Sequence, residues 1–137
     1  MTSPVAAGPT TFAEAIDVVE ETYEFMLAYA AQGRRREEED AGMDIRERLT
    51  RAEAALAIIA SADAGALGAA GEGRMEVGEF FGVVKQDAAR ARSAFRFVLA
   101  QGSIGSQIVD NLNATTHVRT LLTDLFLLDE ALKLSGI

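Results

Sequence analysis

The sequence is poor in the residue types that most recognisable chemistry requires. It contains no cysteine, no tryptophan, one histidine and two prolines in 137 residues. The absence of cysteine excludes disulfides, zinc–thiolate sites and iron–sulfur clusters, and a single histidine excludes histidine-rich metal sites. We therefore expect no metal, no cofactor and no catalytic residue set, and we favour a non-enzymatic protein over an enzyme.

Proline is confined to the first nine residues, where Pro4 and Pro9 lie. Proline inside a helix removes a hydrogen bond and clashes with the preceding turn. The proline-free remainder of the chain therefore favours long, uninterrupted helices. We predict a flexible N-terminal segment over residues 1–10 and a single domain over residues 11–137.

Apolar residues recur at alternating spacings of three and four along most of this domain, which is typical of helices with one buried face. Capping signals precede two of these rows: Thr11 with Glu14, and Asp44 with Glu47. The four expected helices span residues 11–40, 44–64, 76–101 and 103–134.

Glycine recurs through residues 61–78, between the second and third expected helices. Each glycine inside a helix costs about 1 kcal/mol relative to alanine, so this stretch predicts a long connection. The expected fold class is all-α, an up-down-up-down four-helix bundle with a glycine-rich long connection between helices two and three.

Charge is unbalanced toward acids, with a formal net charge of −8. Binding to nucleic acids or to anionic membranes requires a surplus of Lys and Arg, so we expect neither partner. The N-terminus shows no basic, hydrophobic leader, and no apolar run is long enough to predict a membrane span. The expected location is cytoplasmic.

The first expected helix carries a second apolar row beside its main one. Val18, Phe25 and Tyr29 recur at helical spacing, about 100° around the helix from the first row. Two rows cover a wider arc than a surface helix normally buries. On the third expected helix, Val83 and Phe97 also fall outside the main row. We predict that these five residues form an interface with a second copy, as a dimer, or with a helical protein partner.

Charge supports such an interface, because residues 1–33 contain only acidic charges whereas Arg90 and Arg96 lie on the third helix. The leading interpretation is a non-enzymatic helical interaction or assembly protein, such as an adaptor, a small chaperone or an oligomeric subunit. It would act through the apolar face of its first helix. The alternative is that this helix is simply the most buried one of a monomer.

A polar run interrupts the apolar rhythm of the fourth expected helix. Asn111 is expected near the middle of the buried row, partly buried and paired with another helix, with Thr115 near its edge and His117 at its rim. These three residues could line a polar pocket, which makes a small-ligand-binding bundle one alternative function. A second alternative is a signalling module that uses His117, because histidine phosphotransfer domains are four-helix bundles of similar size. Such domains have a glycine a few residues after the histidine, which leaves room for the partner. In this sequence no glycine follows His117 closely, and Leu121 lies in that region.

Overall fold

The computed structural model describes residues 8–36, 44–71 and 75–132, and the regular elements in these ranges are all helical. They are α1 (Phe12–Ala31), α2 (Ile45–Ser61), the 3-10 segment η3 (Ala64–Gly71), α3 (Met75–Leu99), α4 (Ser106–Ala114) and α5 (Thr116–Leu132). The all-α prediction is confirmed, with five α-helices in the described ranges. The prediction of a flexible segment over residues 1–10 falls largely on residues outside those ranges.

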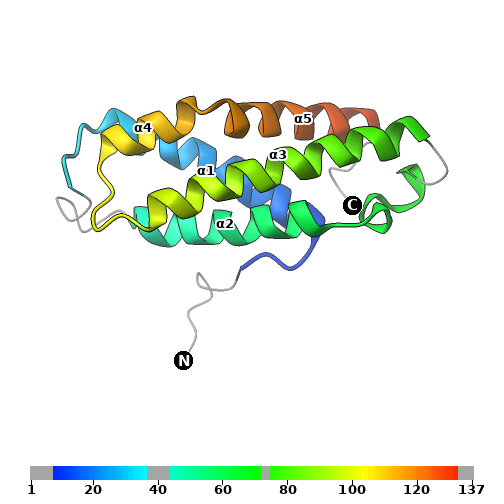
Figure 1. Cartoon of the computed structure of the whole chain (residues 1–137), viewed down its shortest axis with the longest axis horizontal. Helices are drawn as coiled ribbons and strands as arrows, with labels where there is room; N and C mark the ends of the chain where they lie inside the picture. Colours follow the sequence, from blue (N-terminus) through cyan, green and yellow to red (C-terminus); the bar gives the residue numbers. More distant parts are fainter. Residues whose placement is uncertain (1–7, 37–43, 72–74, 133–137) are drawn as a thin grey trace.

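The helices lie side by side along the long axis of the molecule (Figure 1). α2 packs against both α1 and α3, whereas α4 packs mainly against α1 and α5 mainly against α3. One apolar core runs between them. Full burial of a Leu or Met side chain stabilises a fold by about 1.5–3 kcal/mol. Fully buried side chains in this core include Met26, Leu49, Leu56, Leu121 and Leu125.

Both predicted capping signals are present at the starts of helices. The Thr11 hydroxyl accepts a hydrogen bond from the backbone N–H of Glu14, whose carboxylate accepts one from the Thr11 N–H. Asp44 accepts a hydrogen bond from the Glu47 N–H at the start of α2. Each cap satisfies donors that the first turn leaves unpaired and contributes about 1 kcal/mol.

α1 ends at Ala31, so the prediction that the first helix reaches residue 40 is wrong. Gly33 adopts a left-handed backbone with φ 66°, and Arg34 then turns into the molecule and is buried. The Arg34 N–H donates to the Ser106 hydroxyl at 2.8 Å, and the Arg34 carbonyl accepts from the Ser106 N–H at 2.8 Å. The backbone N–H and carbonyl of Arg34 therefore bond to the start of α4 and are not available for the hydrogen bonds of a longer helix.

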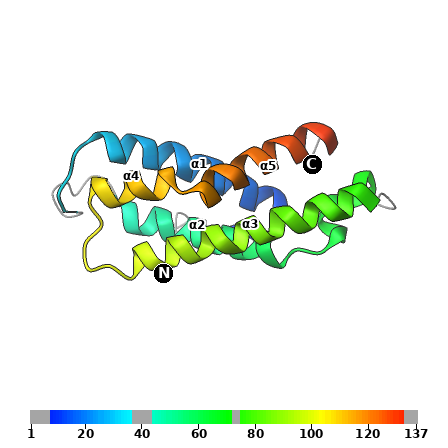
Figure 2. The ribbon, with the colours of Figure 1, turned by 45° about the horizontal axis from the view of Figure 1, so that its top comes forward.

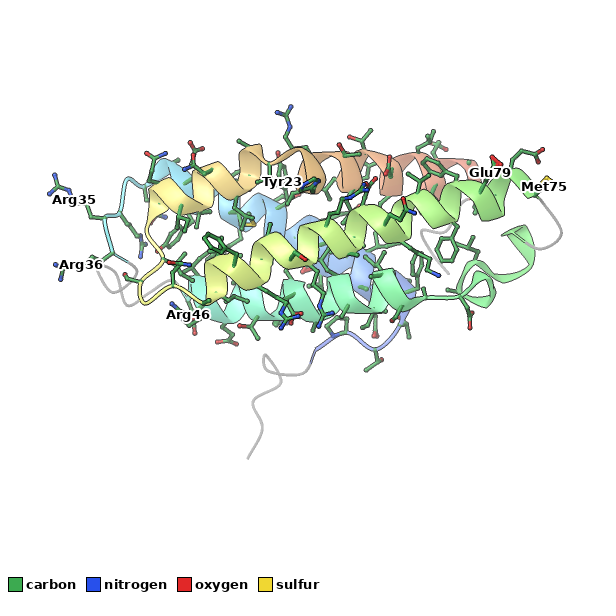
Figure 3. The ribbon with its side chains drawn as sticks, in the orientation of Figure 1. Tyr23, Arg35, Arg36, Arg46, Met75 and Glu79 are labelled. Atoms are coloured by element: carbon green, nitrogen blue, oxygen red, sulfur yellow. The ribbon has the colours of Figure 1, made fainter. Side chains whose placement is uncertain are left out.

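The chain entering α4 passes very close to the chain leaving α1. The Tyr29 hydroxyl donates a hydrogen bond to the carbonyl of Ile104. Gly105 lies so near the backbone that a Cβ atom there would be 2.9 Å from the Arg34 carbonyl oxygen and 2.6 Å from that of Arg35. Figure 3 shows the Arg35 side chain projecting away from this end of the molecule. The two connections are therefore fastened together by buried contacts.

The expected fourth helix, over residues 103–134, is divided at Thr115. Thr115 has an extended backbone, and its hydroxyl and N–H both donate to the Leu112 carbonyl, at 2.8 and 3.1 Å. Threonine readily forms such local hydrogen bonds in competition with the helix. α5 starts again at Thr116 and packs against a different neighbour, so the prediction of one continuous helix is wrong.

Candidate functional site

The break at Thr115 opens a groove between α1 and α5. α4 stays against α1, whereas α5 turns toward α3, so that α1 and α5 diverge beyond the break (Figure 2). The groove has a volume of about 360 Å³. Its walls are formed by Glu20, Tyr23 and Glu24 of α1 and by Arg119, Leu122, Thr123 and Phe126 of α5.

The centre of this α1–α5 groove is apolar. Leu122 is buried and Tyr23 is half-buried, and Tyr23 lies near the junction of α4 and α5 (Figure 3). Phe126 is 54% exposed although it lies beside these apolar side chains. A concave apolar strip between two helices is the shape that receives the apolar side of a third helix.

The α1 rim of the groove is acidic. Burial and neighbouring carboxylates raise the pKa of Glu20, because like charges disfavour its ionised form. The neighbouring carboxylates belong to Asp17, Asp129, Glu24 and Glu21. α1 contains no Lys or Arg, and the basic residue that lines the groove is Arg119 of α5. A cationic group brought to this rim would therefore relieve repulsion that is already present in the free protein.

Three of the five residues predicted to form an interface belong instead to packing within the chain. Val18 and Tyr29 are buried, and Phe25 is half-buried with the Arg48 guanidinium 4.7 Å from its ring centroid. This burial corrects the expectation that the second apolar row of the first helix faces a partner. The row exists because α1 is covered on two sides, by α2 and by α4.

The other two predicted interface residues are exposed on α3. Val83 is 45% exposed and Phe97 is 67% exposed. Arg90 and Arg96 are exposed on the same helix, and α3 contains no acidic residue after Asp87. The C-terminal half of α3 thus presents an apolar and basic surface to its surroundings.

The predicted polar pocket does not match the structure. Asn111 is exposed, and its recorded side-chain partner is Gln107 of the same helix at 3.4 Å, so the prediction of a buried Asn111 paired across helices is wrong. His117 is exposed on α5, and Thr115 ends α4. The buried amide is that of Asn113, which has no hydrogen-bond partner among the described residues. The prediction treated residues 103–134 as one regular helix. Because the helix breaks at Thr115, that regular spacing assigned Asn111 to the core in place of Asn113.

A second, wider recess of about 850 Å³ lies where the end of α1 meets the start of α4. Polar groups at this recess form hydrogen bonds within the chain. Arg34 donates to the Gln32 side chain, and the Ser106 hydroxyl donates to the Tyr29 carbonyl. Its lining contains both basic and acidic residues, among them Arg34 and Asp110. We attribute this recess to the packing of the connections.

The α1–α5 groove is not predictable from the apolar pattern, but the residues around Phe126 carry a signal of it. Residues 125–128 are continuously apolar, which is more than one face of a helix needs to bury. The spacing of apolar residues also places Tyr23 in the main apolar row of the first expected helix, whereas in the structure it is half-buried and lines the groove.

Comparison of the chain with known protein families, curated proteins and solved structures finds no match. None of the described helices combines the length and apolar character needed to cross a membrane. Within the described ranges, no three side chains of His, Cys, Asp or Glu are grouped to hold a metal ion. The groove and the C-terminal half of α3 carry the exposed aromatic side chains Phe126 and Phe97. These two surfaces are therefore the candidate functional sites.

Proposed function

We propose that this chain is a non-enzymatic, cytoplasmic assembly protein in which the C-terminal half of α3 of one copy occupies the α1–α5 groove of a second copy. The observation that carries the proposal is complementarity between two surfaces of the same chain. The groove offers an exposed Phe126 behind the acidic rim of Glu20 and Glu24. α3 offers an exposed Phe97 with exposed arginines beside it.

We also propose that α4 and α5 together take the place of the fourth helix in an up-down-up-down four-helix bundle. The glycine-rich stretch that follows α2 and includes η3 would then be the long connection between α2 and α3. α2 packs along both α1 and α3, and α4 and α5 share the remaining side of the core. The break at Thr115 then has a consequence for function, because a continuous helix packed along α1 would close the groove.

Apolar contact would supply most of the affinity. Phe97 and Phe126 are both more than half exposed in the single chain, and burial of such a ring contributes about 1.5–3 kcal/mol. Aromatic rings that meet each other add about 0.5–1.5 kcal/mol beyond the buried area. Exposed aromatic residues that become buried at the centre of a contact are typical anchors of protein interfaces.

Charge would set the orientation of the contact. Arginines of α3 placed on the rim of Glu20 and Glu24 would relieve the repulsion among the carboxylates there. Charged groups at the edge of an interface mainly govern association rate and choice of partner. Each copy carries one groove and one α3, so a two-fold dimer makes the same contact twice. This symmetry favours a second copy over an unrelated partner.

Sedimentation velocity across a dilution series tests the proposal. The monomer mass is 14.6 kDa, and we expect twice that mass at high concentration, with dissociation on dilution. Added salt should weaken the association, because exposed charges are screened over about 10 Å at 0.1 M salt. A monomer that binds a separate Lys/Leu amphipathic peptide in the groove would refute self-association while retaining the groove as a docking site.

A further inference from the structure

Two aspartates meet between α3 and α5. Asp87 of α3 is only 6% exposed, and Asp124 of α5 is half-buried. Their carboxyl groups lie within hydrogen-bonding reach of each other. In each of them the Oδ2 atom is buried and has no hydrogen-bond partner among the described residues. Two ionised carboxylates in this position would repel each other and leave acceptors unsatisfied away from water.

One cation reaches the pair from its outer side. Arg90 Nη1 lies 3.4 Å from Asp87 Oδ1, and the Arg90 side chain is 59% exposed. An ion pair at such an exposed position is weak, because water screens it. Of the other basic residues of α3 and α5 in the described ranges, Lys85 lies over the Phe81 ring and Arg92 pairs with Glu53 of α2. Arg96 is exposed, and Arg119 is exposed and lines the groove.

The other described elements packed against α5 are η3, α4 and α1, and none of the three contains Lys or Arg. η3 contains no charged residue, and the acid of α4, Asp110, is exposed. On α1, Glu20 interacts with Asp129 of α5. Among the described residues of these elements, of α3 and of α5, Arg90 is the one cation that pairs with the two carboxyl groups.

We propose that Asp87 and Asp124 form a proton-binding site in which one shared proton, taken from water, joins the two carboxyl groups and holds α5 against α3. The proton turns one carboxyl group from an acceptor into an O–H donor, and the other carboxylate accepts the hydrogen bond. The pair then carries one negative charge instead of two, and Arg90 faces that charge. Release of the proton to water restores the repulsion and loosens α5.

The electrostatic surroundings agree with this arrangement. Burial, together with the hydrogen bond and charge of Asp87, raises the pKa of Asp124 from 3.8 to about 7. Because this pKa is higher in the folded chain than in the unfolded one, the site stabilises the fold fully below pH 3.8. The stabilisation is lost as the pH rises through about 7. α5 is a wall of the α1–α5 groove, but the proton site does not depend on assembly.

Hydrogen exchange of the α5 backbone amides tests the site. The measurement uses the variant Phe97→Glu, which is monomeric if the proposed assembly is correct. If the chain does not assemble at all, the exchange rates of α5 still report on the proton site. After correction for intrinsic exchange, we expect α5 amides to exchange about tenfold faster at about pH 8 than at about pH 5. Amides of α2, which packs against α1 and α3, should change far less.

The variant Asp124→Asn, made in the same background, supplies the decisive comparison. Its amide donates a hydrogen bond to Asp87 without a proton that titrates, so α5 should keep its slow exchange at about pH 8. Asp110→Asn is the matched control, because it removes an exposed carboxylate of α4, and it should retain the full pH dependence. The proposal is overturned if Asp124→Asn and Asp110→Asn behave alike, or if the Asp124 carboxyl carbon signal titrates near 3.8.

Discussion

Replacement of Phe126 by glutamate is expected to weaken self-association by about 100-fold or more, since truncation of a buried aromatic anchor commonly costs about 2–4 kcal/mol. Phe126 lies at the apolar centre of the α1–α5 groove and is 54% exposed in the single chain. The substitution should change the free energy of unfolding of the isolated chain only slightly, because this side chain is exposed there. The new carboxylate would also face the acidic rim, although α3 of the partner supplies cations. Sedimentation velocity gives the dissociation constant directly.

Leu127→Glu is the matched control for this variant. Leu127 is the next residue of α5, is 59% exposed and does not line the groove. The substitution adds the same charge at a neighbouring position, so we expect the dissociation constant to stay within a few-fold of the wild-type value. Equal losses in Phe126→Glu and Leu127→Glu would locate the interface elsewhere on α5, and no loss in either would remove α5 from it.

Gly105→Ala is expected to destabilise the fold by about 2–3 kcal/mol, in the upper range for overpacking a closely fitted site. The added Cβ would lie 2.6 Å from the Arg35 carbonyl oxygen and 2.9 Å from that of Arg34. Both contacts are to backbone atoms, and Ser106 holds Arg34 in place through two hydrogen bonds. The chain therefore cannot relax by rotating a side chain. Urea unfolding measures the loss.

Gly102→Ala provides the comparison within the same connection between α3 and α4. A Cβ at Gly102 would meet no atom within 4 Å, so its effect should stay within about 0.5 kcal/mol. Similar stabilities for the two variants would show that the connections do not approach each other as closely as the structure indicates.

The parts of the fold that the sequence predicts correctly depend on local signals. The caps at Thr11 and Asp44 act within one turn, and apolar spacing of three and four residues directly reports a buried helix face. α1, α2 and α3 consequently begin within a residue or so of their expected starts. Helix type and helix start could be predicted because few distant contacts compete with these signals.

The parts that could not be predicted depend on contacts between distant segments. Gly33 is a local signal that favours a helix end near Ala31, but the buried turn at Arg34 depends on hydrogen bonds with the distant Ser106. The same is true of Tyr29, whose apolar ring suggested an interface and whose hydroxyl bonds to the Ile104 carbonyl. Periodicity identifies an apolar surface but not the element that covers it.

The candidate site, too, could be predicted only in its local features. The sequence placed Val83 and Phe97 outside the buried row of α3, and both are exposed. It could not reveal the groove, which exists because the chain breaks at Thr115 and α5 changes neighbour. Threonine at this position is compatible with either a helix or a break. In the structure the chain breaks there, and α5 packs mainly against α3.

Complementary charge variants test most directly whether the acidic rim of one copy receives α3 of another. One variant, Glu20→Gln with Glu24→Lys, removes both acids that line the groove and adds a cation. A second variant, Arg90→Gln with Arg96→Glu, removes two exposed cations of α3 and adds an acid. Each variant alone should be mainly monomeric at a concentration where the wild type is dimeric, because like charges then meet in both contacts of a two-fold dimer. An equimolar mixture should restore the dimer, since both contacts again pair opposite charges. A mixture that stays as monomeric as its separate components, or separate variants that dimerise as well as the wild type, would contradict assembly through the groove.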